Sequence, residues 1–253
     1  DKSYNLLNHL DLGDIVGIEG VLFKTKTGEL TINTNSIVFL AKSLRPLPEK
    51  FHGIADIEIK YRQRYLDLMI NEETKTLFKT RAKIISSIRN FFITDNYLEV
   101  ETPMMHMIPG GASAKPFITH HNSLDMDLYL RIAPELFLKR CIIGGLEKVF
   151  EINRSFRNEG LSVKHNPEFT MIEFYCAYQD YLYLMDIIEK LFVVLTETLG
   201  LSNQVNYQDN QINLSLPFKR VKFYDSLIEH NPKLELSKIN EFNHIKDYCM
   251  ENS

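Results

Sequence analysis

The chain has 253 residues, of which 44% are hydrophobic and 25% charged, and its formal net charge is −4. These values are typical of a soluble globular protein with a substantial core. The charge excludes a global basic field, so a nucleic-acid partner would have to bind at local basic patches. No apolar run approaches the roughly 18–20 residues of a membrane span and no signal peptide opens the chain, so we expect a cytoplasmic protein without a membrane partner.

The three cysteines, Cys141, Cys176 and Cys249, lie far apart and form no C-x-x-C pair. Their odd number and wide spacing favour a reducing compartment and argue against zinc. We interpret them as small, buried hydrophobic residues.

Residues 1–48 predict short strands. Two alternating runs flank Thr27-Gly28, which predicts a hairpin, and the run S-I-V-F-L-A-K-S-L predicts a further strand. Two or three strands cannot bury a face alone, so this segment should belong to a small β domain. Three charged side chains, either solvated or available to a partner, lie on the hairpin: Lys24, Lys26 and Glu29.

Residues 44–53 are interpreted as a linker that Pro46 and Pro48 stiffen. The next segment, 55–71, predicts a helix that is basic on one side.

Residues 72–96 predict a long amphipathic helix, because apolar side chains recur at three- and four-residue spacings. The run Y-L-E-V-E-T-P that follows predicts a strand closed by Pro103. Taken alone, such a helix is an ordinary core element.

Residues 107–117 form a glycine-rich loop in which Gly110-Gly111 permits close approach of the backbone to a ligand. The loop fits neither the G-x-G-x-x-G nor the P-loop pattern. Residues 127–133 predict a strand, and A-P-E-L-F-L-K-R then predicts a helix with Glu135 in its first turn. A carboxylate there suits the helix dipole.

Residues 149–178 predict two antiparallel strands joined by a long polar loop. Alternation places one set of side chains on a common face of each strand, and these are Glu151, Asn153, Ser155 and Arg157, then Phe169, Met171, Glu173 and Tyr175. The loop adds Glu159, His165 and Asn166. A hairpin with one solvated face remains an alternative.

The chain after Tyr178 predicts an amphipathic helix that ends at Gly200. Short strands around 205–207 and 212–214 and then polar helices are expected after it, and none of these segments carries recognisable chemistry.

Three segments of this hairpin together resemble motif 2 of class II aminoacyl-tRNA synthetases in their lysine-specific, bacterial form, and they are F-R-N-E-G, H-N-P-E-F and T-M-I-E-F-Y. The long helix and the strand that ends at Pro103 resemble motif 1, and the similarity runs from about Leu10 to the end of the chain. The resemblance implies an α+β fold, in which an antiparallel sheet flanked by helices is preceded by the C-terminal part of an all-β OB-fold.

The resemblance also implies a division of the chain. Residues 1–48 would be the C-terminal part of an OB-fold anticodon-binding domain, in which Lys24, Lys26 and Glu29 are weak candidates for anticodon contacts. Residues 49–71 would be a linker and connecting helix, and residues 72–253 a class II catalytic domain. Motif 1 implies a homodimer with Pro103 at its interface.

The implied function is ATP-dependent activation of L-lysine to lysyl-adenylate, with transfer to tRNA(Lys). The implied nucleotide-binding residues are Arg157, which is also catalytic and binds the α-phosphate, Glu159 and Phe169 at the adenine, His165 at the outer phosphates and Asn166 nearby. The implied lysine-binding residues are Gly111, Glu135, Glu173 and Tyr175.

Motif 3, with its arginine and the acidic residues that hold Mg²⁺, does not occur before Ser253, and the first OB strands are absent as well. We therefore expect part of a longer protein, in which the Mg²⁺ ligands lie elsewhere, and little adenylation by this chain alone. Two alternatives remain open: a lysine- or adenylate-binding relative without catalysis, and a ligase that attaches lysine to a protein. Residues 12–48 argue against the second, because such ligases lack the OB module.

Overall fold

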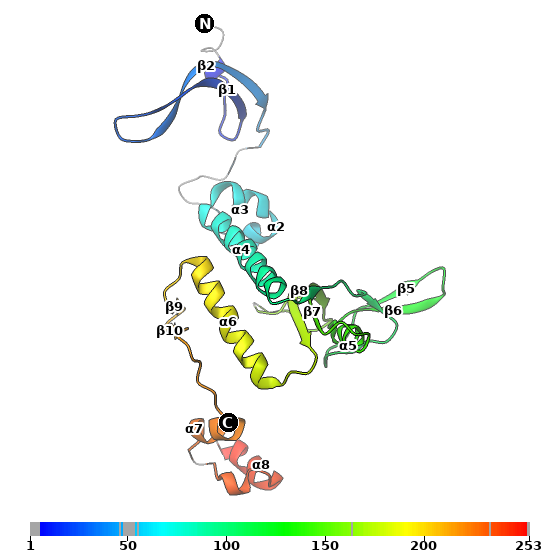
Figure 1. Ribbon diagram of the computed structural model, residues 1–253. Coiled ribbons are helices and arrows are strands. Elements are labelled where there is room, and N and C mark those ends of the chain that lie inside the picture. The colour runs from blue at the N-terminus through cyan, green and yellow to red at the C-terminus, as the bar shows by residue number, and fades with distance from the viewer. Residues whose placement is uncertain are drawn as a thin grey trace. The chain divides into compact units, whose positions relative to one another are not determined.

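The computed structural model describes residues 6–45, 47, 54, 56–162, 164–232 and 234–251 (Figure 1). Pro46, Pro48 and most of the expected linker lie outside the described residues. By its internal contacts the chain divides into two units, Asp1–Ala82 and Lys83–Ser253.

The first unit contains a long antiparallel hairpin of β1 (Ile15–Lys24) and β2 (Leu30–Ala41). The predicted turn is confirmed: Thr25 N donates to Glu29 O at 2.9 Å and Gly28 has φ +85°. The prediction of a further, separate strand after the hairpin is wrong, because β2 runs unbroken from Leu30 to Ala41. The register of the two strands shifts between Glu19 and Gly20. Glycine suits this position, because a Cβ at Gly20 would collide with the carbonyl oxygen of Asn33.

This hairpin leaves apolar side chains exposed along both strands. Val21, Leu22 and Leu30 are each more than 60% exposed. The finding agrees with the expectation that two strands alone cannot bury a face.

The single helix expected over 55–71 is instead two helices, α2 (Ile57–Arg62) and α3 (Arg64–Ile70), which meet at Gln63. The buried carboxylate of Asp67 accepts hydrogen bonds from Arg64 Nη1 at 2.5 Å, Asn71 Nδ2 at 2.6 Å and Thr74 Oγ1 at 3.1 Å. The backbone of Gln63 departs from helical values, with φ −119° and ψ 56°, and this separates the two helices.

The helix α4 (Glu72–Thr94) begins in the first unit and ends in the second. It leads to β3 (Leu98–Glu99), which pairs in parallel with β7 (Lys148–Phe156), and β7 pairs antiparallel with β8 (Glu168–Cys176). The strand predicted to reach Pro103 is therefore much shorter. Beyond Glu99 the ladder continues only through Val100 N, which donates to Phe150 O at 3.0 Å.

A second sheet has the order β4-β6-β5, with β4 at Met105–His106, β5 at Ile118–His121 and β6 at Met126–Leu130. The predicted strand 127–133 ends early because Arg131 bonds through its carbonyl to β7, a strand of the other sheet. Its N–H donates to Met104 O at 2.8 Å, and its carbonyl accepts from Phe156 N at 2.9 Å. The helix α5 (Glu135–Ile143) follows, with Pro134 as its N-cap residue.

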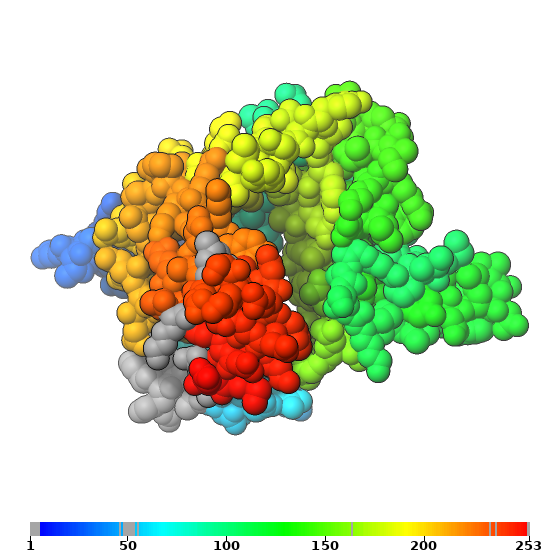
Figure 2. Space-filling model, turned by 90° about the horizontal axis from the view of Figure 1, so that it is seen from below, coloured from blue at the N-terminus to red at the C-terminus, as the bar shows by residue number. Residues whose placement is uncertain are grey.

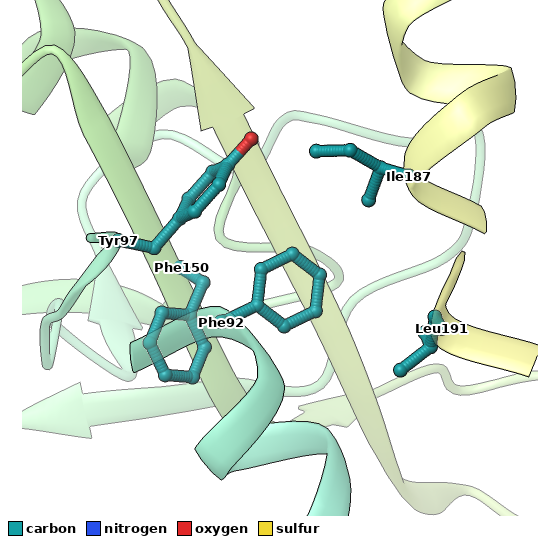
Figure 3. Close-up of a cluster of buried hydrophobic side chains, with 5 residues drawn as sticks. All are labelled: Phe92, Tyr97, Phe150, Ile187 and Leu191. Carbon is teal, nitrogen blue, oxygen red and sulfur yellow. The ribbon is translucent and has the colours of Figure 1, made fainter. Parts of the chain in front are cut away.

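The core of the second unit lies between α4, the β7–β8 pair and α6 (Tyr181–Leu199), as Figure 3 shows. The Phe92 ring is fully buried and stacks on Phe150 with ring centroids 5.3 Å apart; Phe174 lies 4.7 Å from it. Ile187 and Leu191 of α6 complete the cluster. The helix ends where predicted, at Gly200 with φ +64°.

The outer side of α6 is open to solvent, and its yellow atoms form part of the visible surface in Figure 2. Tyr181 is 67% exposed and Leu182 45%. The hairpin of β9 (Gln204–Tyr207) and β10 (Asn210–Asn213) comes next, as predicted, and then α7 (Phe223–His230), a short 3₁₀ helix (Leu236–Lys238) and α8 (Phe242–Glu251). Among the described residues, no helix combines the length and the apolar character that crossing a bilayer requires.

Candidate functional site

The β7–β8 pair aligns its polar side chains as alternation predicts. Glu151 stands opposite Glu173, Asn153 opposite Met171 and Ser155 opposite Phe169. The face is not solvated along its length, because Glu151, Asn153 and Ser155 are 3%, 6% and 0% exposed. The alternative of a hairpin with one wet face is therefore wrong for these residues. The opposite face carries Phe150 and Phe174 into the core.

A pocket of about 260 Å³ lies where β7 runs into its loop. Its lining contains all five residues predicted to bind the nucleotide, and the complete set is Arg157, Glu159, Gly160, Lys164, His165, Asn166, Pro167 and Phe169. The guanidinium carbon of Arg157 lies 5.1 Å from the centroid of the Phe169 ring. Arg157 Nε is buried, and none of the described residues offers it an acceptor. The guanidinium of Arg157 has an N–H donor without an acceptor and lies over an aromatic ring. This arrangement suits a ligand that is both anionic and aromatic.

Backbone hydrogen bonds fix the loop that carries these residues. Arg157 N donates to Pro167 O at 2.8 Å, so the two ends of the loop are tied together. Asn158 N donates to Lys115 O at 2.7 Å, which ties the loop to the glycine-rich segment. Ser162 Oγ lies 2.7 Å from His165 Nδ1. Sequence reasoning did not single out Lys115, because its contribution is a backbone carbonyl and carries no residue signal.

The glycine-rich segment lies against the start of α5. Gly111 has φ +88°, and a Cβ built on it would lie 3.0 Å from Glu135 Cβ and 3.2 Å from Ala133 Cβ. The structure therefore brings together Gly111 and Glu135, two of the predicted lysine-binding residues. Glu135 Oε1 is 2.6 Å from the ammonium of Lys139 one turn along the helix.

The other two predicted lysine-binding residues are joined by a hydrogen bond, in which the Tyr175 hydroxyl donates to Glu173 Oε2 at 3.0 Å. Burial raises the pKa of Glu173, and the charges of Glu135 and Glu151 raise it further, whereas the Tyr175 bond acts in the opposite direction. Burial, with the adjacent Glu173 charge, also raises the pKa of the Tyr175 phenol, which therefore stays a neutral donor. Such a concentration of negative charge suits a cationic ligand.

A buried ion pair beneath this site was not predicted. Arg131 Nη1 lies 2.6 Å from Glu151 Oε1, and the two side chains are 3% and 4% exposed. The sequence signal was a charged residue inside each of two apolar runs, L-Y-L-R-I-A and V-F-E-I. Charged residues are almost never fully buried unless paired.

The remaining predicted residues lie elsewhere. Lys24, Lys26 and Glu29 are exposed on the hairpin of the first unit. Pro103 is exposed between β3 and β4, and its carbonyl is 2.9 Å from His106 Nε2. Across the part of the chain that the structure describes, no three His, Cys, Asp or Glu side chains form a group able to hold a metal ion.

Comparison with known proteins connects this site to a family. The profile described as tRNA synthetases class II (D, K and N) matches residues 56–250. The chain is 55% identical over 241 residues to a lysine–tRNA ligase of Nitrosomonas europaea, covering 95% of this chain and 48% of that protein. It is 58% identical over 233 residues to a lysine–tRNA ligase of Dichelobacter nodosus, covering 92% and 47%.

The chain thus spans about half the length of the curated relatives it matches. The family profile covers most of the chain, including the pocket at Arg157 and the acidic group at Glu173. This chain belongs to the class II tRNA synthetases of the D, K and N group.

Proposed function

We propose that this protein is a lysine–tRNA ligase, which activates L-lysine with ATP to lysyl-adenylate and transfers the lysyl group to tRNA(Lys). The observation that carries the proposal is the pocket at the end of β7, because its lining unites Arg157, Glu159, His165, Asn166 and Phe169. The two relatives reported above are both named lysine–tRNA ligases, which supports the choice of amino acid.

In the first step, a carboxylate oxygen of lysine attacks the α-phosphorus of ATP. A bond forms between that oxygen and phosphorus, the bond to the bridging oxygen breaks, and pyrophosphate leaves with its electron pair. Positioning and charge stabilisation dominate such a reaction, and the Arg157 guanidinium would bind two α-phosphate oxygens at once. The lysine carboxylate is already ionised, so no general base is needed.

Lysine would be recognised by the acidic group beside this pocket. Glu135 would accept a hydrogen bond from the α-ammonium, with Gly111 close to it. Glu173, which already accepts from the Tyr175 hydroxyl, would also accept from the side-chain ammonium. A carboxylate without its partner is costly to bury, so the site would reject amino acids that lack a terminal ammonium.

The wider assignments are part of the same proposal. Residues 1–48 would be the C-terminal part of an OB-fold that binds the anticodon, 49–71 a linker and connecting helix, and 72–253 the catalytic domain of a cytoplasmic homodimer with Pro103 at its interface. Mg²⁺ would neutralise the phosphates of bound ATP. In the described part of the chain, no group of His, Cys, Asp or Glu side chains is arranged to hold this ion.

Lysine-dependent exchange of pyrophosphate into ATP, measured on the protein made from its complete gene, tests the proposal. Arg157→Lys should lower kcat/KM about 10²- to 10³-fold, as loss of a transition-state donor does. The matched control is Arg154→Lys, three residues earlier, whose exposed guanidinium lies 3.4 Å from Glu168 Oε1; it should keep near-normal activity. Binding of lysine and ATP without exchange would instead support a non-catalytic relative, and lysylation of a protein but not of tRNA would support the other alternative.

A further inference from the structure

Arg131 lies at the junction of the two three-stranded sheets and has no part in the reaction proposed above. Its Nη1 is 2.6 Å from Glu151 Oε1 and also donates to the carbonyl and hydroxyl oxygens of Thr102, both at 3.2 Å. Its Nε donates to the carbonyl of Arg154 at 2.8 Å. One buried guanidinium therefore joins the end of β6, strand β7 and the segment before β4.

The partner of Arg131 is the cross-strand neighbour of a predicted lysine-binding residue. Glu151 stands directly opposite Glu173 on the same face of the β7–β8 pair, and like charges in that relation repel. Arg131 and the Thr102 hydroxyl, which donates to Glu151 Oε2 at 2.7 Å, satisfy both oxygens of Glu151.

Four charged or titratable groups act on Glu173 from four parts of the fold: Tyr175 on its own strand, Glu151 on β7, Glu135 on α5, and Arg131 after β6. Burial and the two carboxylates raise the pKa of Glu173. Arg131 is the one cation among these four, and it lowers that pKa. Without the guanidinium, Glu151 and Glu173 would face each other with no buried counter-charge, and the pair would take up a proton at higher pH.

We propose that Arg131 is a positioning residue for lysine recognition, which binds Glu151 so that the Glu173 carboxylate stays ionised and available to the side-chain ammonium of the substrate. The inference rests on the proposed function, because it assigns that ammonium to Glu173. A neutral carboxyl at Glu173 would lose most of its attraction for the cation.

The test compares Arg131→Met with Arg131→Lys in the protein made from its complete gene, with pyrophosphate exchange followed from about pH 6 to about pH 9. Arg131→Met should raise the KM for lysine about tenfold near neutral pH, a coupling usual for interacting charged groups. The KM should recover as the pH rises and Glu173 ionises, and the KM for ATP should stay unchanged. Arg131→Lys keeps the positive charge but loses the planar set of guanidinium donors. It should therefore keep the wild-type pH profile.

A purely structural role predicts a different pattern, in which kcat and both KM values change together and the pH profile does not shift; that pattern would overturn the inference. Because loss of one partner of a buried ion pair destabilises a fold, Arg131→Met is also combined with Glu151→Gln. The double variant removes both buried charges and should return to the wild-type pH profile. Arg220→Met is the matched control, since Arg220 bridges Asp186 and Glu189 away from the site.

A second readout needs no substrate. The carboxyl carbon of Glu173, followed by NMR during a pH titration, should titrate at higher pH in Arg131→Met than in the unmodified protein. An unchanged midpoint would overturn the inference whatever the activities are. Absence of lysine-dependent exchange in the unmodified protein would overturn the proposed function instead, and the titration would still decide the role of Arg131.

Discussion

His106 illustrates at the scale of one residue how burial changes a titratable group. The side chain is 3% exposed, its Nε2 lies 2.9 Å from Pro103 O, and its ring centroid is 4.7 Å from that of Phe137. Burial lowers the pKa of His106, and the nearby Arg131 and Arg140 lower it further, against the Pro103 hydrogen bond and Glu151. The folded protein therefore holds this imidazole neutral, with its Nε2–H donated to the Pro103 carbonyl.

The first prediction concerns stability against pH. In the unfolded chain His106 binds a proton below its ordinary pKa of about 6.5, whereas the folded form takes up that proton only at lower pH. The unfolded state thus binds more protons in this window, so the free energy of unfolding should fall as the pH drops below about 6.5. Urea unfolding at a series of pH values measures the slope.

His106→Gln should flatten this slope, whereas the control His121→Gln, at an exposed position on β5, should leave it unchanged. Equal slopes in the protein and in His106→Gln would show that His106 is not the group responsible.

At the scale of elements, the site depends on a loop that lies very close to a helix start. Gly111 has φ +88° and approaches Glu135 at a distance that leaves no room for a Cβ without movement. Gly145, after α5, has φ +97°, but a Cβ there would meet no atom within 4 Å. Substitutions at these two positions therefore distinguish the effect of backbone strain, which both share, from that of steric contact, which only Gly111 has.

Gly111→Ala should raise the KM for lysine about tenfold, because the new methyl group displaces the loop from Glu135 and because a left-handed alanine costs roughly 1–2 kcal/mol. The KM for ATP should change much less. Gly145→Ala should lower the unfolding free energy by a similar strain and leave the KM for lysine unaltered. Equal effects of both changes on this KM would mean that close approach at Gly111 has no part in recognition.

The element that supports the site from behind is the aromatic core. Phe92 has no exposed surface and its ring contacts Phe91, Tyr97, Phe150 and Phe174. Because Phe150 and Phe174 lie on the strands that also carry Glu151 and Glu173, this packing sets the position of the acidic face.

Phe92→Ala should lower the free energy of unfolding by about 3–5 kcal/mol, through lost burial and the cavity left behind. Ile93→Ala, the next residue of α4 and 50% exposed, should change it by about 0.5 kcal/mol or less. Chemical denaturation followed by circular dichroism compares the two, and a small effect at Phe92 would mean that the core relaxes around the cavity.

At the scale of the whole molecule, the net charge determines how a polyanion such as tRNA would bind. The net charge is −4, so tRNA would bind through local cations rather than through a general field. Lys24 and Lys26 are exposed at the end of the β1–β2 hairpin and are the candidates named above.

Replacing both Lys24 and Lys26 by alanine should weaken tRNA binding and reduce the slope of log K against log salt by roughly 1.4–1.8, since each phosphate contact contributes roughly 0.7–0.9. Filter binding at several salt concentrations measures this slope. Lysine-dependent pyrophosphate exchange should be unaffected, and Lys219→Ala, which removes a cation 2.8 Å from Glu229, is the control. An unchanged slope would mean that both hairpin lysines are merely solvated.

The sequence by itself determined the local structure and the family. The turn at Gly28, the end of α6 at Gly200 and the shared face of β7 and β8 all follow from residue type or from alternation, which act over a few neighbouring residues. The motif words around Arg157 were sufficient to indicate class II, and the family profile agrees.

Only the tertiary structure decided what covers each face and where several other elements end. Alternation placed Glu151 and Glu173 together, but the buried carboxylate of Glu151 is satisfied by Arg131 and Thr102, which lie 20 and 49 residues from it along the chain. The early end of β6 likewise follows from a hydrogen bond to a distant partner, because the carbonyl of Arg131 accepts from Phe156 N on β7. The physical reason is the same throughout: periodicity fixes which side chains share a face, whereas burial and electrostatics depend on groups that only the folded chain brings near.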